Sequence, residues 1–201
     1  MKMLILCVIG YLIGSIPFAL VIGKVFYKTD VREHGSGNLG GGNTGRVLGK
    51  KAGVAVMTLD ILKVAFVVLL AQRFLCTEIA IASGGLAAAV GHCWPIFAGF
   101  KGGKAVATMY GFLFGLFVFV GYSPVVFFLP LLVFLLVLKL TKIISLSSII
   151  SAVAVTIYIY LSTESTPVFL ALVVFTLLII IRHRKNIERI CKHQENKISW
   201  M

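Results

Sequence analysis

Residues 53–72 read GVAVMTLDILKVAFVVLLAQ and contain only two charged side chains, Asp60 and Lys63. A helix needs about 20 mostly apolar residues to cross the hydrocarbon core of a bilayer, so this stretch predicts a transmembrane helix. Asp60 and Lys63 are three positions apart, which places them on the same side of that helix, where they can neutralise each other. Ionisable groups within a membrane are functional candidates by default, but we interpret these two as a structural ion pair.

The rest of the chain has the same apolar character. Hydrophobic residues make up 59% of the 201 residues, and the mean hydropathy of +1.03 leaves too little polar surface for a water-soluble globule. We therefore predict an all-α integral membrane protein with about seven transmembrane helices in a single domain, residues 1–201. The other six apolar stretches are residues 3–26, 79–98, 105–121, 124–139, 146–162 and 166–181.

Three of these stretches are less regular than the others. The stretches 105–121 and 124–139 are short for a span, and 79–98 contains His92 and Pro95. Part of 91–104 is therefore a candidate re-entrant segment, which a membrane tolerates only where protein or water shields it. The N-terminal stretch has no convincing cleavage site, so we interpret it as a retained span and not as a signal peptide.

The basic residues are distributed unevenly between the two ends of the predicted helices. All Lys and Arg residues except Lys2, Lys63 and Arg73 lie in the loops 24–52, 99–104 and 139–145 and in the tail from 182. Positively charged loops stay in the cytoplasm. The predicted orientation therefore has the N-terminus outside, the C-terminus in the cytoplasm and every polar motif on the cytoplasmic side.

The loop 35–46 reads GSGNLGGGNTGR, with six glycines, two asparagines and an arginine. Glycine and asparagine are typical of turns between helices, but a simple turn would not require this density of glycine. Consecutive backbone N–H groups can form a concave nest for an anion, and a helix beginning near Arg46 would add its positive N-terminal end. We therefore favour a phosphate-binding cradle. A Walker A loop is excluded because its G-x-x-x-x-G-K-[ST] order is absent.

A second polar cluster, GHCWPIFAGFKGGK, occupies residues 91–104. Trp94 and Lys101 are of the residue types that anchor helices at the membrane–water interface. Lys104 follows two glycines and is the better candidate for a phosphate ligand. His92 fits a hydrogen bond within the core as well as it fits a functional role.

Two further polar segments lie on the same predicted side. Hydroxyl residues at 141–148 begin the sixth helix and include Ser145; capping is the ordinary role of such residues. The tail 182–189, RHRKNIER, is compatible with simple attraction to anionic lipid. His183 and Asn186, however, are three residues apart and share one side of a helix, which favours a common polar pocket.

Taken together, these motifs resemble those of the PlsY family, the bacterial membrane acyl-phosphate:glycerol-3-phosphate acyltransferases. The resemblance covers nearly the whole chain and is specific. The matching segments are Ser36-Gly37-Asn38 through Asn43 and Arg46; Gly91-His92, Pro95-Ile96-Phe97 and Phe100-Lys101-Gly102-Gly103-Lys104; Ser145; and His183-Arg184, Asn186-Ile187 and Arg189. Some positions depart from the family pattern, with Leu39 in place of proline, Gly41-Gly42 in place of Ala-Thr, and Ala105 and His193 in place of glycine.

The resemblance implies transfer of an acyl group from acyl phosphate to the 1-hydroxyl of glycerol-3-phosphate. The product is 1-acylglycerol-3-phosphate (lysophosphatidic acid), made for phospholipid synthesis in the bacterial inner membrane. The candidate catalytic residues are Ser36, Arg46, Lys104, His183 and Asn186. The candidate substrate and phosphate contacts are Gly37, Asn38, Gly40, Gly41, Gly42, Asn43, His92, Lys101, Gly102, Gly103 and Ser145.

An acyl phosphate already has a good leaving group, so the reaction needs positioning and charge stabilisation more than a covalent nucleophile. The base that deprotonates the glycerol hydroxyl is either His183 or a phosphate oxygen of the substrate. We expect no cofactor, metal or nucleic acid; the oligomeric state stays open. The alternatives are a transporter or channel for phosphorylated metabolites, which would place its site near the membrane midplane, and a structural membrane protein whose basic face holds anionic lipid.

Overall fold

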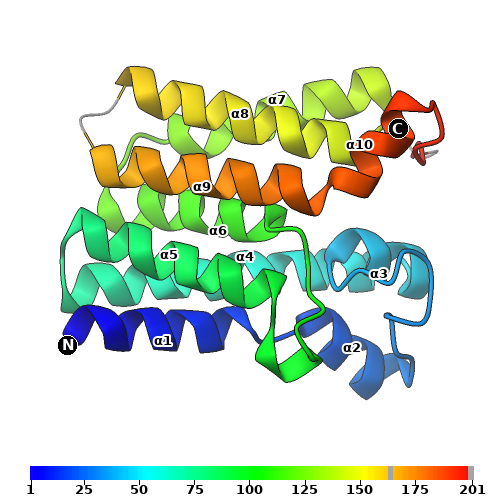
Figure 1. The fold of residues 1–201 in the computed structure, drawn as a ribbon, viewed down its shortest axis with the longest axis horizontal. Coiled ribbons are helices and arrows are strands. Elements are labelled where there is room, and N and C mark those ends of the chain that lie inside the picture. Colours follow the sequence, from blue (N-terminus) through cyan, green and yellow to red (C-terminus); the bar gives the residue numbers. More distant parts are fainter. Residues whose placement is uncertain (163–164, 199–201) are drawn as a thin grey trace.

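The computed structural model describes residues 1–162 and 165–198, and its regular elements are all helical (Figure 1). The long helices run side by side, so that the chain repeatedly crosses from one end of the bundle to the other. The elements are α1 (Lys2–Gly14), α2 (Phe18–Tyr27), α3 (Gly41–Leu48), α4 (Lys50–Phe74), α5 (Glu78–Cys93), a 3₁₀ turn (Ile96–Ala98), α6 (Val106–Gly115) with a π-helical continuation (Leu116–Val120), α7 (Val125–Thr141), α8 (Ile144–Ser162), α9 (Thr166–Arg182) and α10 (Arg184–Cys191).

The outer surface of the bundle is apolar, as expected for a protein surrounded by lipid. Large hydrophobic side chains on several helices face outward, including Leu4, Phe66, Leu132 and Leu161. Within the described residues, four helical segments are long and apolar enough to cross a membrane, or five if α9 and α10, bent by 60°, count as one. The segments 106–120 and 125–141 are shorter apolar helices, in agreement with the short stretches that the sequence indicated.

The helices pack closely because glycine is present where two backbones meet. A Cβ atom on Gly14 would lie 2.1 Å from the carbonyl oxygen of Ala88 on α5, and one on Gly111 would lie 2.3 Å from that of Ile61 on α4. Small residues allow this approach between membrane helices. At the centre of the bundle the rings of Phe112 and Phe175 stack at 5.3 Å.

The first apolar stretch, expected as one helix, consists of two. The chain breaks between α1 and α2 at residues 15–17, where Pro17 has no N–H to donate and disfavours the helical conformation of the residue before it. The break frees the carbonyl of Ile16, which accepts a hydrogen bond of 3.0 Å from Nζ of Lys63. Lys63 also pairs with Asp60 at 2.6 Å, so the predicted structural pair is present. Lys63 in addition supplies the hydrogen-bond donor for the backbone carbonyl in the break between α1 and α2.

The loops at the opposite end from the N-terminus rest on a second, small hydrophobic core. Leu39, where the family pattern has proline, is 3% exposed and belongs to this core. The other members come from α2, the loop after it, α4 and the 3₁₀ turn: Ala19, Ile22, Val31, Ala52, Val56 and Ala98. The glycine-rich loop is therefore supported from below by packed side chains.

The candidate active site

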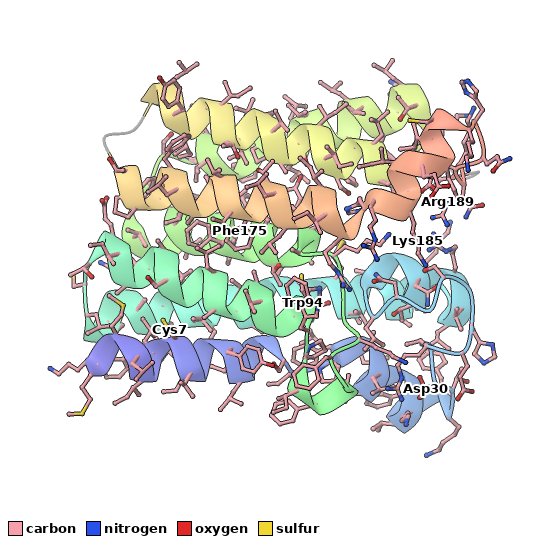
Figure 2. All side chains as sticks on the ribbon, viewed as in Figure 1. Cys7, Asp30, Trp94, Phe175, Lys185 and Arg189 are labelled. Carbon is pink, nitrogen blue, oxygen red and sulfur yellow. The ribbon has the colours of Figure 1, made fainter. Side chains whose placement is uncertain are left out.

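The polar side chains gather at one end of the bundle, where α2, α3 and α10 lie (Figures 1 and 2). Labelled side chains at that end include Asp30, Lys185 and Arg189, whereas Phe175 lies among carbon-rich side chains in the middle (Figure 2). The segments that sequence analysis singled out come together at this end from distant parts of the chain.

The glycine-rich loop is organised by Asn43. Its side-chain amide nitrogen donates to the carbonyls of Val31 and His34 at 3.0 and 3.2 Å, and its oxygen accepts from the backbone N–H and the hydroxyl of Ser36 at 2.8 and 3.1 Å. Asn43 is 1% exposed. Its amide is thus occupied within the protein, and its role in this structure is to fold the loop beneath Ser36.

The second half of the glycine-rich segment is helical. The helix expected near Arg46 begins at Gly41, so Arg46 lies inside α3 and the predicted loop cradle is confined to residues 35–40. The helix was expected too late in the sequence because the glycines at 41, 42 and 45 were interpreted as part of an open loop that binds phosphate. A Cβ on Gly53 of α4 would lie 2.7 Å from Cα of Gly45 and 2.8 Å from the carbonyl oxygen of Gly41, so these glycines let α3 pack against α4.

The remaining candidates on the loop lie around its exposed rim. Gly37 adopts a left-handed conformation with φ +68°, which favours glycine. Gly40 precedes the first residue of α3, and the side-chain nitrogen of Asn38 lies close above it. A Cβ on Gly42 would meet nothing within 4 Å. Ser36 and Arg46 are both exposed and therefore accessible to a ligand. The Ser36 hydroxyl lies 3.5 Å from a guanidinium nitrogen of Arg46.

Gly102 and Gly103 are held between α5 and α9. The N–H of Gly103 donates to the carbonyl of His92 at 3.0 Å. Arg182 donates from Nε to the carbonyl of Gly103 and from a terminal nitrogen to that of Gly102, both at 2.9 Å. A Cβ on Gly103 would lie 2.0 Å from Nε2 of His92. Both glycines are buried, so in this structure they allow close packing around Lys104 and do not offer an open cradle.

His92 is engaged in the membrane-buried ion pair. Its Nδ1 atom lies 3.1 Å from Nζ of Lys63 and 3.5 Å from Oδ1 of Asp60. His92 is 6% exposed, and of the two roles left open by its sequence, the hydrogen bond within the core is the one observed. Lys101, in contrast, is exposed on the loop before Gly102.

Lys104 reaches a polar network built by the C-terminal segment. Its Nζ atom donates to Oδ1 of Asn186 at 2.5 Å. The amide nitrogen of Asn186 donates to Oε1 of Glu195 at 2.5 Å, and the same oxygen accepts from the hydroxyl of Ser145 at 2.9 Å. Oε2 of Glu195 accepts from Nε of Arg189 at 2.7 Å. Burial acts to raise the pKa of Glu195, but these hydrogen bonds hold it below its usual range, so the carboxylate stays ionised.

The surroundings of Lys104 lower its pKa. Burial lowers the pKa of Lys104 to about 8; the Glu195 carboxylate acts against this shift, and the charges of Arg189, Arg46 and Arg182 act in the same direction as burial. Arg46 of α3 therefore lies near enough to exert its charge on Lys104. Arg46 of the glycine-rich segment and Arg189 of the C-terminal segment therefore both act on the charge of Lys104.

His183 follows the last residue of α9 and is 3% exposed. Its Nδ1 lies 2.8 Å from the carbonyl of Ile179, a contact that requires Nδ1 to carry the hydrogen and leaves the lone pair on Nε2. Burial, and after it the charge of Lys104, lowers the pKa of His183 to about 4. His183 is therefore neutral near pH 7, with a free acceptor nitrogen.

Three residues of this region were not assigned to the site from sequence. Arg189 was noted only for its match to a motif, Arg182 only as part of the basic tail, and Glu195 was not among the candidate residues. Their partners are far away in sequence, so no local pattern could reveal them. Among the described residues, no group of three or more His, Cys, Asp or Glu side chains is arranged to hold a metal ion.

Comparison with known proteins identifies the family. The family model described as glycerol-3-phosphate acyltransferase matches residues 4–193. The chain belongs to the glycerol-3-phosphate acyltransferase family. A family member from Streptococcus pneumoniae is 42% identical over 199 residues, which cover 98% of this chain and 93% of that protein. One from Geobacillus kaustophilus is 44% identical over 196 residues, covering 98% and 96%.

Solved structures of glycerol-3-phosphate acyltransferases agree with the fold. The crystal structure of PlsY (YgiH), an integral membrane glycerol 3-phosphate acyltransferase in its glycerol 3-phosphate form, is 37% identical with a TM-score of 0.91, covering 99% of this chain and 96% of that one. Its lysophosphatidic acid form gives a TM-score of 0.89. The resemblance seen in the motifs is thus confirmed: this chain is an integral membrane acyltransferase.

Proposed function

We propose that this protein transfers an acyl group from an acyl phosphate to the 1-hydroxyl of glycerol-3-phosphate, releasing lysophosphatidic acid and inorganic phosphate. Family membership supports glycerol-3-phosphate as the acceptor, and one solved relative is described in a glycerol 3-phosphate form. The observation that best supports the site is the position of Lys104. Its half-buried ammonium donates a hydrogen bond to Asn186, and the charge of Arg46 acts on it. A region with both cations suits two anionic substrates.

The proposed contacts divide between the two sides of this region. Arg46, Ser36 and the backbone N–H groups of residues 38–40 bind one phosphate, at the loop rim. Lys104, with Asn186 and Ser145, binds the other and orients the glycerol. A charge-assisted hydrogen bond contributes about 1.5–3 kcal/mol, whereas an acyl chain gains little by moving from lipid to an equally apolar groove. The phosphates therefore dominate recognition.

In the proposed reaction, the 1-hydroxyl oxygen of glycerol-3-phosphate attacks the acyl carbonyl carbon. The new ester C–O bond forms, the bond between the acyl carbon and the phosphate oxygen breaks, and phosphate departs with the electron pair. The hydroxyl proton passes to Nε2 of His183 or to a phosphate oxygen. Because the pKa of His183 is lowered to about 4, His183 is a weak base, which favours the phosphate oxygen as the final acceptor.

We further propose that the whole chain, residues 1–201, works as one domain in the bacterial inner membrane. About seven spans, with the N-terminus outside, would place the polar end in the cytoplasm, where water-soluble glycerol-3-phosphate is available. The basic loops at that end support this orientation.

The donor is tested by incubating purified protein in lipid nanodiscs with labelled glycerol-3-phosphate and either acyl phosphate or acyl-coenzyme A. Labelled lysophosphatidic acid should form with acyl phosphate only. Formation with acyl-coenzyme A alone would refute the proposed donor. Lys104→Ala should abolish transfer, whereas Lys185→Ala, which removes an exposed cation on α10, should leave it near normal. Near-normal activity of folded, membrane-inserted Lys104→Ala would contradict the proposed role of Lys104.

A further inference from the structure

The segment Gly102–Gly103 places Lys104 but has no side chains of its own to fix its position. Both glycines are buried, and the space around them is filled by the backbone and ring of His92. Any anchor must therefore act on the peptide groups. On the α5 side, that anchor is the hydrogen bond from the N–H of Gly103 to the carbonyl of His92.

The anchor on the other side is Arg182. Its guanidinium donates to two consecutive carbonyls, those of Gly102 and Gly103, each at 2.9 Å. The planar fork of arginine suits such a two-point contact, which a lysine ammonium does not reproduce. The guanidinium carbon also lies 5.5 Å from the ring centroid of Trp94, a distance that permits a cation–π interaction.

We propose that Arg182 is a positioning residue of the acyltransferase site: by holding the carbonyls of Gly102 and Gly103, it sets Lys104 relative to His183 and Asn186. Arg182 is the last residue of α9, and His183 follows it directly. The hydrogen bonds of Arg182 thus join the loop that bears Lys104 to the helix end that bears His183. These two hydrogen bonds add to the direct contact between Lys104 and Asn186 and fix the backbone from which the Lys104 side chain extends.

An interfacial anchor would be expected to behave differently. The ordinary role of an arginine at a membrane helix end is to extend toward lipid headgroups and water. Arg184, two residues later, is exposed and fits that description. Arg182 is only partly exposed, and its guanidinium donates hydrogen bonds to protein carbonyls. It does so although its positive charge disfavours the ammonium form of Lys104. The geometry therefore favours a role in placement over a role in lipid attraction.

The inference rests on the proposed function, and the test separates the two. Arg182→Lys, which keeps the charge and loses the fork, is compared with Arg182→Gln and with the matched control Arg184→Gln, all in nanodiscs. A misplacement of about 1 Å can cost about 100-fold in rate, so we expect kcat/KM of Arg182→Gln to fall by that order. Arg182→Lys should fall between Arg182→Gln and the wild type, and Arg184→Gln should match the wild type.

A second measurement is independent of turnover. An amine-specific reagent is applied over a range of pH, and modification of Lys104 is quantified by peptide mass spectrometry. In Arg182→Lys the nearby positive charge remains, so a shift of the midpoint toward higher pH would report that Lys104 has moved to a more exposed position. The unfolding temperature of each variant shows whether the fold is intact.

The outcomes are distinct. Wild-type activity together with an unchanged Lys104 profile in Arg182→Lys and Arg182→Gln would overturn the proposal. Equal losses in Arg182→Gln and Arg184→Gln would overturn it as well, because they would indicate a general effect of charge at the membrane. If the wild-type protein itself transfers no acyl group from any donor, the proposed function fails, while the Lys104 profile still reports on Arg182.

Discussion

At the scale of single residues, Lys104 combines a charge with partial burial. The ammonium makes a short hydrogen bond to Asn186, and the charge of the Glu195 carboxylate offsets only part of the effect of burial and of the cationic neighbours. The net effect lowers the pKa of Lys104 to about 8. An anionic substrate would add further negative charge beside this ammonium and stabilise its charged form.

A pH dependence follows from this pKa. The acting form of Lys104 is the ammonium, which is present below the pKa and lost as the pH rises through about 8. We therefore expect kcat/KM for glycerol-3-phosphate to fall with increasing pH above about 8, since kcat/KM reports the ionisation of the free enzyme. Initial rates in nanodiscs, corrected for spontaneous hydrolysis of acyl phosphate, measure it. A plateau up to pH 10 would contradict this expectation.

Two residues that the motif resemblance would lead us to expect as glycine adopt left-handed backbone conformations. Ala105 has φ +62° and His193 has φ +55°. A side chain in this region costs about 1–2 kcal/mol, so the departures from glycine carry strain. At Ala105, which is fully buried, the packed methyl group offsets part of that cost. His193 is exposed and has no such compensation.

His193→Gly should therefore stabilise the protein. Part of the released strain is lost to the greater freedom of glycine in the unfolded chain, which leaves a gain of up to about 1 kcal/mol, or about 2–4 °C in unfolding temperature. Thermal unfolding in detergent measures it. His193→Ala is the control, because it removes the imidazole but keeps the Cβ atom. A rise of equal size in both variants would show that the backbone is not responsible.

At the scale of elements, the close contact between α3 and α4 depends on glycine. A Cβ on Gly53 would strike Cα of Gly45 at 2.7 Å, whereas a Cβ on Gly45 would meet Gly53 at 3.6 Å, an ordinary contact. Gly53→Ala should therefore push α3 away and destabilise the protein by about 1–3 kcal/mol. Because α3 contains Arg46, transfer should fall as well.

The matched variant is Gly45→Ala, at the same contact but with room for the methyl group. It should keep the unfolding temperature of the wild type in the detergent-solubilised protein. Equal behaviour of the two variants would indicate that α3 can shift without cost.

Prediction from sequence succeeded for the apolar helices and failed for α3. Apolar length identified the apolar helices, since hydrophobicity is a property of each stretch by itself. It could not identify α3, because Gly41-Gly42-Asn43-Thr44-Gly45 has low intrinsic helix propensity and becomes helical by packing against Gly53. Spacing placed His183 and Asn186 on one side of a helix, and the resemblance added Lys104 and Ser145; the structure joins Lys104, Asn186 and Ser145 in one hydrogen-bond network. Arg182 was missed because its partners are backbone carbonyls that leave no trace in the sequence.

At the scale of the whole molecule, the two ends of the bundle differ in charge and each bears an exposed cysteine. Cys76 lies in the turn between α4 and α5, at the end that includes the N-terminus, and Cys191 lies at the end of α10. Both are exposed, whereas Cys93 is buried and Cys7 is partly buried. The native thiols therefore serve as probes of orientation.

With the proposed orientation, a membrane-impermeant maleimide added to right-side-out membrane vesicles should label Cys76 at once. It should label Cys191 only after the vesicles are permeabilised. Peptide mass spectrometry distinguishes the two sites without further mutation, and Cys93 provides an internal blank. Labelling of Cys191 before permeabilisation, with Cys76 protected, would reverse the assigned orientation.

The hydrogen bond from Lys63 to the carbonyl of Ile16 has a consequence for biogenesis. While the ribosome has delivered only the first helical segment to the translocon, the carbonyl exposed by the break at Pro17 has no donor, and in hydrocarbon such a group costs several kcal/mol. The donor arrives with the next long helix. The N-terminal segment is thus completed only when its successor enters the bilayer, which favours joint insertion of the two as a helical hairpin.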